Sequence, residues 1–259
     1  MCVGLYPRDS VTWRVNRESA LLLAGGRALL LQLAHPSVAA GVFEHSDFRE
    51  RPLRRLNRTL TLTLALTFGT REEALASARS INATHRRVRG QGYQAGDPRL
   101  LLWVLATLVD TSLLAYQTFV GPLTTGEREA YYEEAKTIGG LLGIPAGHYP
   151  RGLEEFERYV AGMLHGDQLA VDERARSLAR SVLWPAIGPL PRATWHPIAA
   201  LTAALLPERL RIAYGLPWGR LERGLAAVQR RSVRMLVPHL PGPLRFVPAA
   251  RTAGPLRAA

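Results

Sequence analysis

The chain has 259 residues, of which 47% are hydrophobic, and its formal net charge at pH 7 is +12. A chain of this length and hydrophobicity can bury a sizeable core, which excludes disorder as a description of the whole. Its single cysteine, Cys2, excludes a disulfide framework and a cysteine-rich zinc or iron–sulfur site.

Helix signals dominate the N-terminal half, and no run alternates with the period of two that a strand needs. An Ala/Leu-rich helix is expected over 18–33, and Pro52 takes the first-turn position of the next, over 52–68. Capping boxes that begin at Thr70 and Thr124, and an N-cap followed by proline at Asp97, mark three further starts. These three helices are predicted over about 71–88, 98–120 and 125–142.

Prolines divide the C-terminal half into shorter pieces. The predicted helices there are 153–164, 172–183, 192–205, 207–214 and 218–237. After Pro238 the Pro/Gly/Arg-rich tail, 238–259, is expected to be irregular. Since neither an internal repeat nor a polar linker divides the chain, the sequence predicts one all-α domain over 1–259.

Targeting signals are not evident in the sequence. The first 16 residues contain no apolar run of signal-peptide type, and the apolar stretches 20–34 and 60–68 are too short to cross a bilayer. We therefore expect a cytoplasmic protein, with peripheral membrane contact left open and the oligomeric state undetermined.

The predicted helix 71–88 carries a histidine on its apolar face. Residues Ala74, Ala78, Ile81, His85 and Val88 follow one another at helical spacing. A histidine in such a stripe is most often a core residue that hydrogen-bonds to the backbone. The functional alternative is an axial ligand of haem iron, and the small alanines would let a flat group approach.

The preceding helix begins with a polar face. Arg55 and Thr59 share this face with the leucines that follow, and Arg58 lies beside them. Such a charged start is usually solvated. If this face lies opposite His85 across a pocket, however, the same residues form the distal side of a cofactor site.

Five short runs follow one another along the first half of the chain. They are RALLLQLAHPSVAAG (27–41), EHSDF (44–48), LTFGT (66–70), HRRVRG (85–90) and LWVLATLVD (102–110). Together they resemble the MpaB-type oxygenase and rubber oxygenase (latex clearing protein) family. Their order along the chain is more specific than any one of them, and the resemblance is clear over 17–145 and looser beyond.

The resemblance implies an all-helical, globin-like core that holds haem b. His85 matches the proximal iron ligand of the family, and Arg89 matches the conserved companion of that ligand. We expect Arg89 to lie one turn beyond His85 on the same side, where it could pair with a haem propionate. Arg55 and Thr59 match distal residues. Arg58 replaces a lysine that can take the sixth iron position, and a guanidinium is a poor ligand, so water or no ligand is expected there.

Three further residues are weaker candidates. His35 stands at a helix end, where it either caps the last carbonyl groups or contacts the cofactor. Glu44, next to His45, is either a general base or part of a surface turn. Asp110 lies in a very apolar helix and needs a partner, either an arginine or a histidine N–H that it would orient as the proximal ligand. The other histidines, at 148, 165, 196 and 239, show no ligand spacing.

Three functions follow from these patterns. The first is a haem b-dependent oxygenase that uses dioxygen to oxidise or cleave a carbon–carbon double bond in an apolar, isoprenoid or lipid-like substrate, with Arg55, Arg58 and Thr59 stabilising developing negative charge. The second is a non-catalytic haem sensor or carrier. The third, a nucleic-acid-binding module, is disfavoured because the basic residues, all arginine except Lys136, are spread along the chain without interleaved aromatics.

Overall fold

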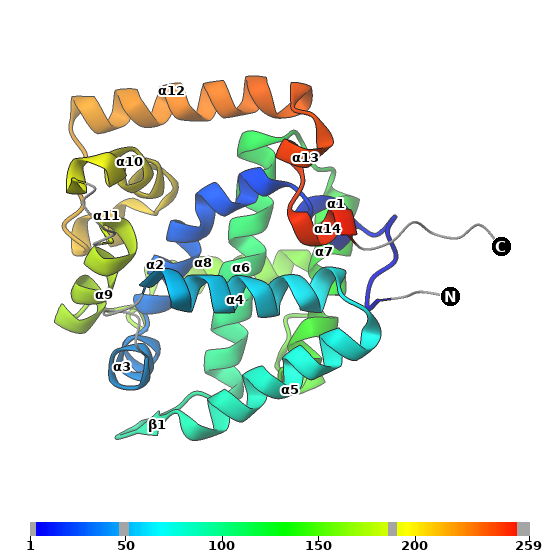
Figure 1. The fold of residues 1–259 in the computed structure, drawn as a ribbon. Coiled ribbons are helices and arrows are strands. Elements are labelled where there is room, and N and C mark those ends of the chain that lie inside the picture. The colour runs from blue at the N-terminus through cyan, green and yellow to red at the C-terminus, as the bar shows by residue number, and fades with distance from the viewer. Residues whose placement is uncertain (1–3, 47–51, 186–190, 253–259) are drawn as a thin grey trace.

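The structure, a computed structural model, describes residues 4–46, 52–185 and 191–252, and the chain there is almost entirely helical (Figure 1). The N-terminal half contains α1 (Val11–Asn16), the 3-10 helix η1 (Ser19–Ala24), α2 (Gly25–Leu33), α3 (Pro36–His45), α4 (Pro52–Phe68), α5 (Arg71–Arg87), α6 (Pro98–Phe119) and α7 (Thr125–Leu141). The C-terminal half contains η3 (Ala146–His148), α8 (Leu153–His165), α9 (Glu173–Leu183), η4 (Arg192–Trp195), α10 (His196–Leu205), α11 (Glu208–Ala213), α12 (Arg220–Leu236), η5 (Val237–His239), α13 (Gly242–Arg245) and α14 (Pro248–Thr252). The all-α prediction is confirmed, whereas the globin-like arrangement stays a prediction.

Local capping signals place the helix starts where the sequence predicts them. In α5 the Thr70 hydroxyl accepts from the Glu73 N–H at 3.2 Å, and the Glu73 carboxylate accepts from the Thr70 N–H at 2.8 Å. Thr124 and Glu127 form the same box at the start of α7. Asp97 accepts from the Arg99 N–H at 2.8 Å and begins α6. These bonds satisfy N–H groups that the first helical turn leaves without partners.

The helix predicted over 18–33 is divided in two. A 3-10 segment, η1, ends at Ala24, and α2 begins at Gly25. Just before η1, the Glu18 side chain is only 1% exposed, and the Arg245 guanidinium donates to both of its oxygens at 2.9–3.1 Å. This contact fixes the chain immediately before η1.

The tail predicted to be irregular is helical and packed as far as the structure describes it. The short helices η5, α13 and α14 cover most of 237–252. Phe246 bridges to Glu18, and the Val247 N–H donates to the Arg17 carbonyl at 2.8 Å. Residues 253–259, Cys2 and the pair at 47–48 lie outside the described residues.

A small hairpin also departs from the prediction that no strand is present. Strand β1 (Arg89–Gly90) pairs antiparallel with β2 (Tyr93–Gln94). The turn depends on Gly92, whose φ of 76° lies in the left-handed region that favours glycine. Two residues per strand give no alternation that a sequence pattern can show.

Helix α6 is the centre of the core. It runs through the middle of the molecule (Figure 1), packs against η1, α2, α7, α8 and α12, and buries Trp103 and Phe119 almost completely. By length and composition it could cross a membrane, and so could η1, α2 and α3 taken together as one bent span. With 22 residues, α6 is longer than the stretches 20–34 and 60–68, the two apolar stretches expected to be too short to cross a bilayer. Most of its apolar window, 61%, is buried against the rest of the chain, which suits the core helix of a packed domain.

Candidate functional site

The imidazole of His85 lies near the C-terminal end of α5 and is half-buried. Its Nδ1 atom is buried and has no hydrogen-bond partner within the described residues, so the backbone bond expected of a core histidine is not formed by this atom. Burial, and then the positive charge of Arg55, lower the pKa of His85 from its ordinary value. The ring is therefore neutral near pH 7, which is the protonation state that binds a metal.

Helices α4 and α5 pack against each other and bring Arg55 towards His85. Only Gly69 and Thr70 connect the two helices, so the chain reverses sharply between them (Figure 1). The guanidinium of Arg55 donates to the Ser46 hydroxyl at 3.1 Å and to the Thr59 hydroxyl at 3.1 Å. Arg55 thus bonds to Thr59, whose side chain is exposed, and lies close enough to His85 to affect its pKa, whereas a distal-side role for Arg55 and Thr59 stays a prediction.

Arg58 does not join this group. Its side chain is exposed on α4, which agrees with the alternative of a solvated helix start. Arg54, one residue before Arg55, is exposed as well. A place for Arg58 on the distal side of a cofactor therefore stays a prediction.

The expectation for Arg89 is wrong in its geometry. Helix α5 ends at Arg87, and Val88 takes up extended backbone angles, so Arg89 is not one helical turn beyond His85. Arg89 instead belongs to β1, is exposed, and donates through Nη2 to the Arg86 carbonyl at 3.0 Å.

His35 caps a helix, but not the one predicted. Its Nδ1 accepts from the Ser37 N–H at 3.3 Å, which places the ring at the start of α3 rather than on the last carbonyl groups of α2. Burial lowers the pKa of His35 from its ordinary value, and a neutral ring is what this acceptor role requires. Its expected contact with a cofactor stays a prediction.

Glu44 is held by two partners. It accepts from the Tyr93 hydroxyl at 2.6 Å and from Arg174 Nη1 at 3.1 Å, which links α3 to β2 and α9. Burial and this hydrogen bond raise the pKa of Tyr93 to about 12. Glu44 is exposed, as the surface alternative expects, but it lies in the last turn of α3 and not in a surface turn, and a general base at Glu44 would first have to leave these partners.

Asp110 has an arginine partner, one of the two predicted. Arg27 on α2 is 5% exposed and donates to Asp110 Oδ2 at 2.6 Å, to Thr111 Oγ1 at 2.6 Å and to the Leu205 carbonyl at 2.8 Å. The three acceptors lie on α6 and α10. Asp110 therefore joins helices within the core, and the buried Nδ1 of His85 receives no bond from it.

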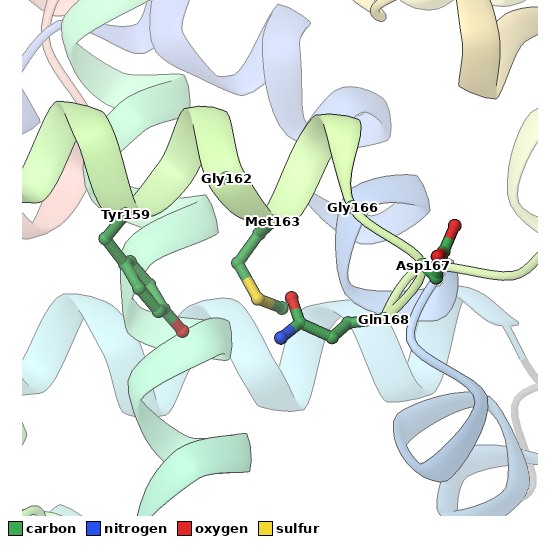
Figure 2. Close-up of a pocket in the computed structure, with 6 residues that line it drawn as sticks. All are labelled: Tyr159, Gly162, Met163, Gly166, Asp167 and Gln168. Atoms are coloured by element: carbon green, nitrogen blue, oxygen red, sulfur yellow. The ribbon is translucent and has the colours of Figure 1, made fainter.

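Two cavities were not foreseen from the sequence. One, of about 630 Å³, lies at the end of α8, where Tyr159, Met163 and Gln168 extend to the same side (Figure 2). Gly162, in the last turn of α8, and Gly166, directly after the helix, also line this cavity, and this pair of glycines is the feature of the sequence that could have indicated it. The other, of about 640 Å³, is lined by Arg89, Gly90, Gly92, Tyr93, Gln94 and Asp97. Neither is lined by His85.

No group of three or more histidine, cysteine, aspartate or glutamate side chains gathers as a metal site within the described residues. A site that binds iron through protein side chains alone would need such a group. The role of His85 as an axial ligand of haem iron stays a prediction.

Comparison with known proteins assigns the chain to a family. Residues 13–237 match the family described as ER-bound oxygenase mpaB/B′ and rubber oxygenase, catalytic domain. The chain is also 31% identical over 227 residues to an uncharacterized protein of Mycobacterium bovis and to one of Mycobacterium tuberculosis, a match that covers 82% of this chain and 88% of each relative. No solved structure matches the chain. The chain therefore belongs to the mpaB and rubber oxygenase catalytic-domain family.

Proposed function

We propose that the chain is a haem b-dependent oxygenase that uses dioxygen to oxidise or cleave a carbon–carbon double bond in an apolar, isoprenoid or lipid-like substrate. Family membership supports the oxygenase class. The observation that best supports haem binding is the neutral imidazole of His85, whose buried Nδ1 has no hydrogen-bond partner within the described residues.

Two features around His85 support a haem at this position. Ala74 and Ala78, on the same face of α5, are small, so they would leave room for a flat group once the packing that now buries both of them opens. The guanidinium of Arg55 supplies a positive charge near the ring, which favours an anionic group such as a propionate in the same space. His85 would hold the iron through a ring nitrogen, and the haem would supply the activation of dioxygen.

Arg55 and Thr59 would act as proton-bearing groups beside this site. The guanidinium remains charged throughout the reaction, and it donates to the Thr59 hydroxyl at 3.1 Å, while that hydroxyl donates to the Arg55 carbonyl at 3.0 Å, so the N–H donors of Arg55 are held in one orientation. Such fixed donors stabilise negative charge that develops on a reacting oxygen. Glu44 can accept an allylic proton only after it releases Tyr93 or Arg174.

An absorption spectrum tests the haem directly. Protein purified from haem-replete cells should show a Soret band, and the pyridine haemochrome should identify haem b. His85→Ala should lose the band while keeping its helical circular dichroism. His165→Ala is the matched control, because this exposed ring forms a hydrogen bond with the Ala161 carbonyl of its own helix, and it should keep the band. A colourless wild type, or a haem-replete His85→Ala, would refute the proposal.

Glu44 is hydrogen-bonded to Tyr93 and Arg174 and so is not free to act as a base, which favours a second candidate, a haem-binding sensor or carrier without turnover. Dioxygen consumption distinguishes the two. With a polyisoprenoid or an unsaturated lipid, the oxygenase should consume dioxygen in proportion to product, whereas a sensor that binds haem should consume none. The double variant Tyr93→Phe/Arg174→Gln should raise the rate if Glu44 is the base, because it frees the carboxylate.

A further inference from the structure

Helix α12 lies along one edge of the molecule, and in Figure 1 no other element covers its outer side. Its inner side packs against α10 and α6. Ala226 is 1% exposed on this side, and Glu222 is buried, where it accepts from the Gly219 N–H at 2.7 Å and lies 3.2 Å from His196 Nε2. The helix is thus anchored by a narrow inner face, and the rest of its surface faces solvent.

One flank of this outer surface is apolar. Leu221, Val228 and Met235 follow one another at intervals of seven residues, which places them on a single face. Their exposed fractions are 69%, 63% and 61%, and Leu236, beside Met235, is 59% exposed. A row of large apolar side chains in water is unfavourable and marks a surface that is covered in use.

The other flank is basic. Its five arginines are exposed and lie at positions 220, 223, 230, 231 and 234. Within the described residues none of these five arginines has a carboxylate partner. Two of them, Arg223 and Arg234, donate to backbone carbonyl groups instead. The single acid of the helix, Glu222, faces inward, so the outer surface carries five uncompensated positive charges.

From this pairing of an apolar and a basic flank, we propose that α12 docks on an anionic membrane surface. The apolar flank would enter the boundary between headgroups and acyl chains, and the arginines would bind lipid phosphates, as in amphipathic helices that lie in the interface plane. The inference does not depend on haem or on the proposed oxygenase activity.

Charge argues against other occupants. A second copy that paired through the same face would bring five arginines against five, and like charges repel. A nucleic acid would use the arginines but would leave Leu221, Val228 and Met235 without a role, because single strands are bound on aromatic side chains. An anionic lipid surface uses both flanks at once.

Vesicle co-sedimentation tests the proposal on the full chain. Wild type should bind vesicles of phosphatidylcholine with phosphatidylglycerol, and much more weakly those of phosphatidylcholine alone. Since each arginine near an anionic surface contributes about fivefold in affinity, Arg230→Gln/Arg231→Gln should bind about 30-fold more weakly. The control Arg71→Gln/Arg79→Gln removes the same charge from α5, where both side chains are exposed, and should bind nearly as wild type.

The apolar flank is tested with a matched pair of variants, one on α12 and one outside it. Leu221→Ser should weaken vesicle binding about tenfold, because one leucine no longer enters the bilayer. Ile212→Ser, on α11, changes a side chain that is equally exposed, at 69%, and should have little effect. Circular dichroism should show that all four variants stay folded. The proposal would be overturned if the variants and their controls lost vesicle binding equally, or if wild type did not bind anionic vesicles. So would a dimer in sedimentation velocity that Leu221→Ser dissociates.

Discussion

The pair formed by Arg27 and Asp110 allows a quantitative test of what Asp110 does. Asp110→Ala leaves a guanidinium that is 5% exposed with only two neutral acceptors, Thr111 Oγ1 and the Leu205 carbonyl. Removal of one partner from a buried pair costs about 3–5 kcal/mol. Because the Asp110 side chain is 30% exposed and two acceptors remain, we expect the lower end, about 3 kcal/mol. In a chain of this size the thermal midpoint should fall by about 6–12 °C.

Urea unfolding is the assay. The midpoint should move to lower urea concentration without a change of slope, because the surface exposed on unfolding stays the same. The double variant Arg27→Met/Asp110→Leu should recover part of the loss, since it removes the charge along with its partner. If Asp110→Ala costs less than about 1 kcal/mol, the pair does not stabilise the core as reasoned. If the variant stays folded yet loses haem that wild type binds, Asp110 acts on His85 instead.

Three smaller predictions concern single positions. Thr70→Ala should cost about 1 kcal/mol in urea unfolding, because it removes the hydroxyl that caps α5. Gly26→Ala should cost about 1–3 kcal/mol, since its Cβ would lie 2.3 Å from Thr202 Oγ1 on α10, whereas Gly25→Ala meets open space and should be neutral. Since burial holds the pKa of His85 below 6.5, its neutral form stabilises the apoprotein above pH 6.5, and this contribution should be lost as pH falls through the lowered pKa; His85→Gln should flatten that dependence.

Each of these has a result that contradicts it. An unchanged midpoint for Thr70→Ala would mean that the cap adds nothing to α5. Equal stability of the two glycine variants would mean that α2 and α10 are not in close contact at Gly26. A histidine NMR signal that belongs to His85 and titrates above pH 6.5 would place the ring in water rather than in a desolvated site.

Features that depend on neighbours in sequence could be predicted. The starts of α5, α6 and α7 follow from caps formed within three residues, at Thr70, Asp97 and Thr124. The bond between Arg55 and Thr59 follows from their separation by four residues on one helix. In each case the partner lies within one turn, so the spacing along the chain already determines the contact.

Features that depend on residues far apart in the sequence could not be predicted from it. The sequence gives no sign that Arg27, rather than a histidine, would reach Asp110, because the two residues lie on different helices. The predicted position of Arg89 is wrong for a related reason. A helical pattern predicts where a residue lies only while the helix continues, and α5 ends at Arg87. The cavity at the end of α8 depends on how several elements meet, which no local pattern contains.

The contact between Glu18 and Arg245 has a consequence for the order of folding. The two residues are 227 positions apart, and the Glu18 side chain is 1% exposed. While the chain is being synthesised, Glu18 leaves the ribosome long before Arg245, and its burial in that interval would leave a carboxylate without this counter-ion. We therefore expect the first segments to remain loosely packed until nearly the whole chain is released. A nascent chain that stops short of Arg245 should be digested by protease at its N-terminal end, whereas the complete chain should resist.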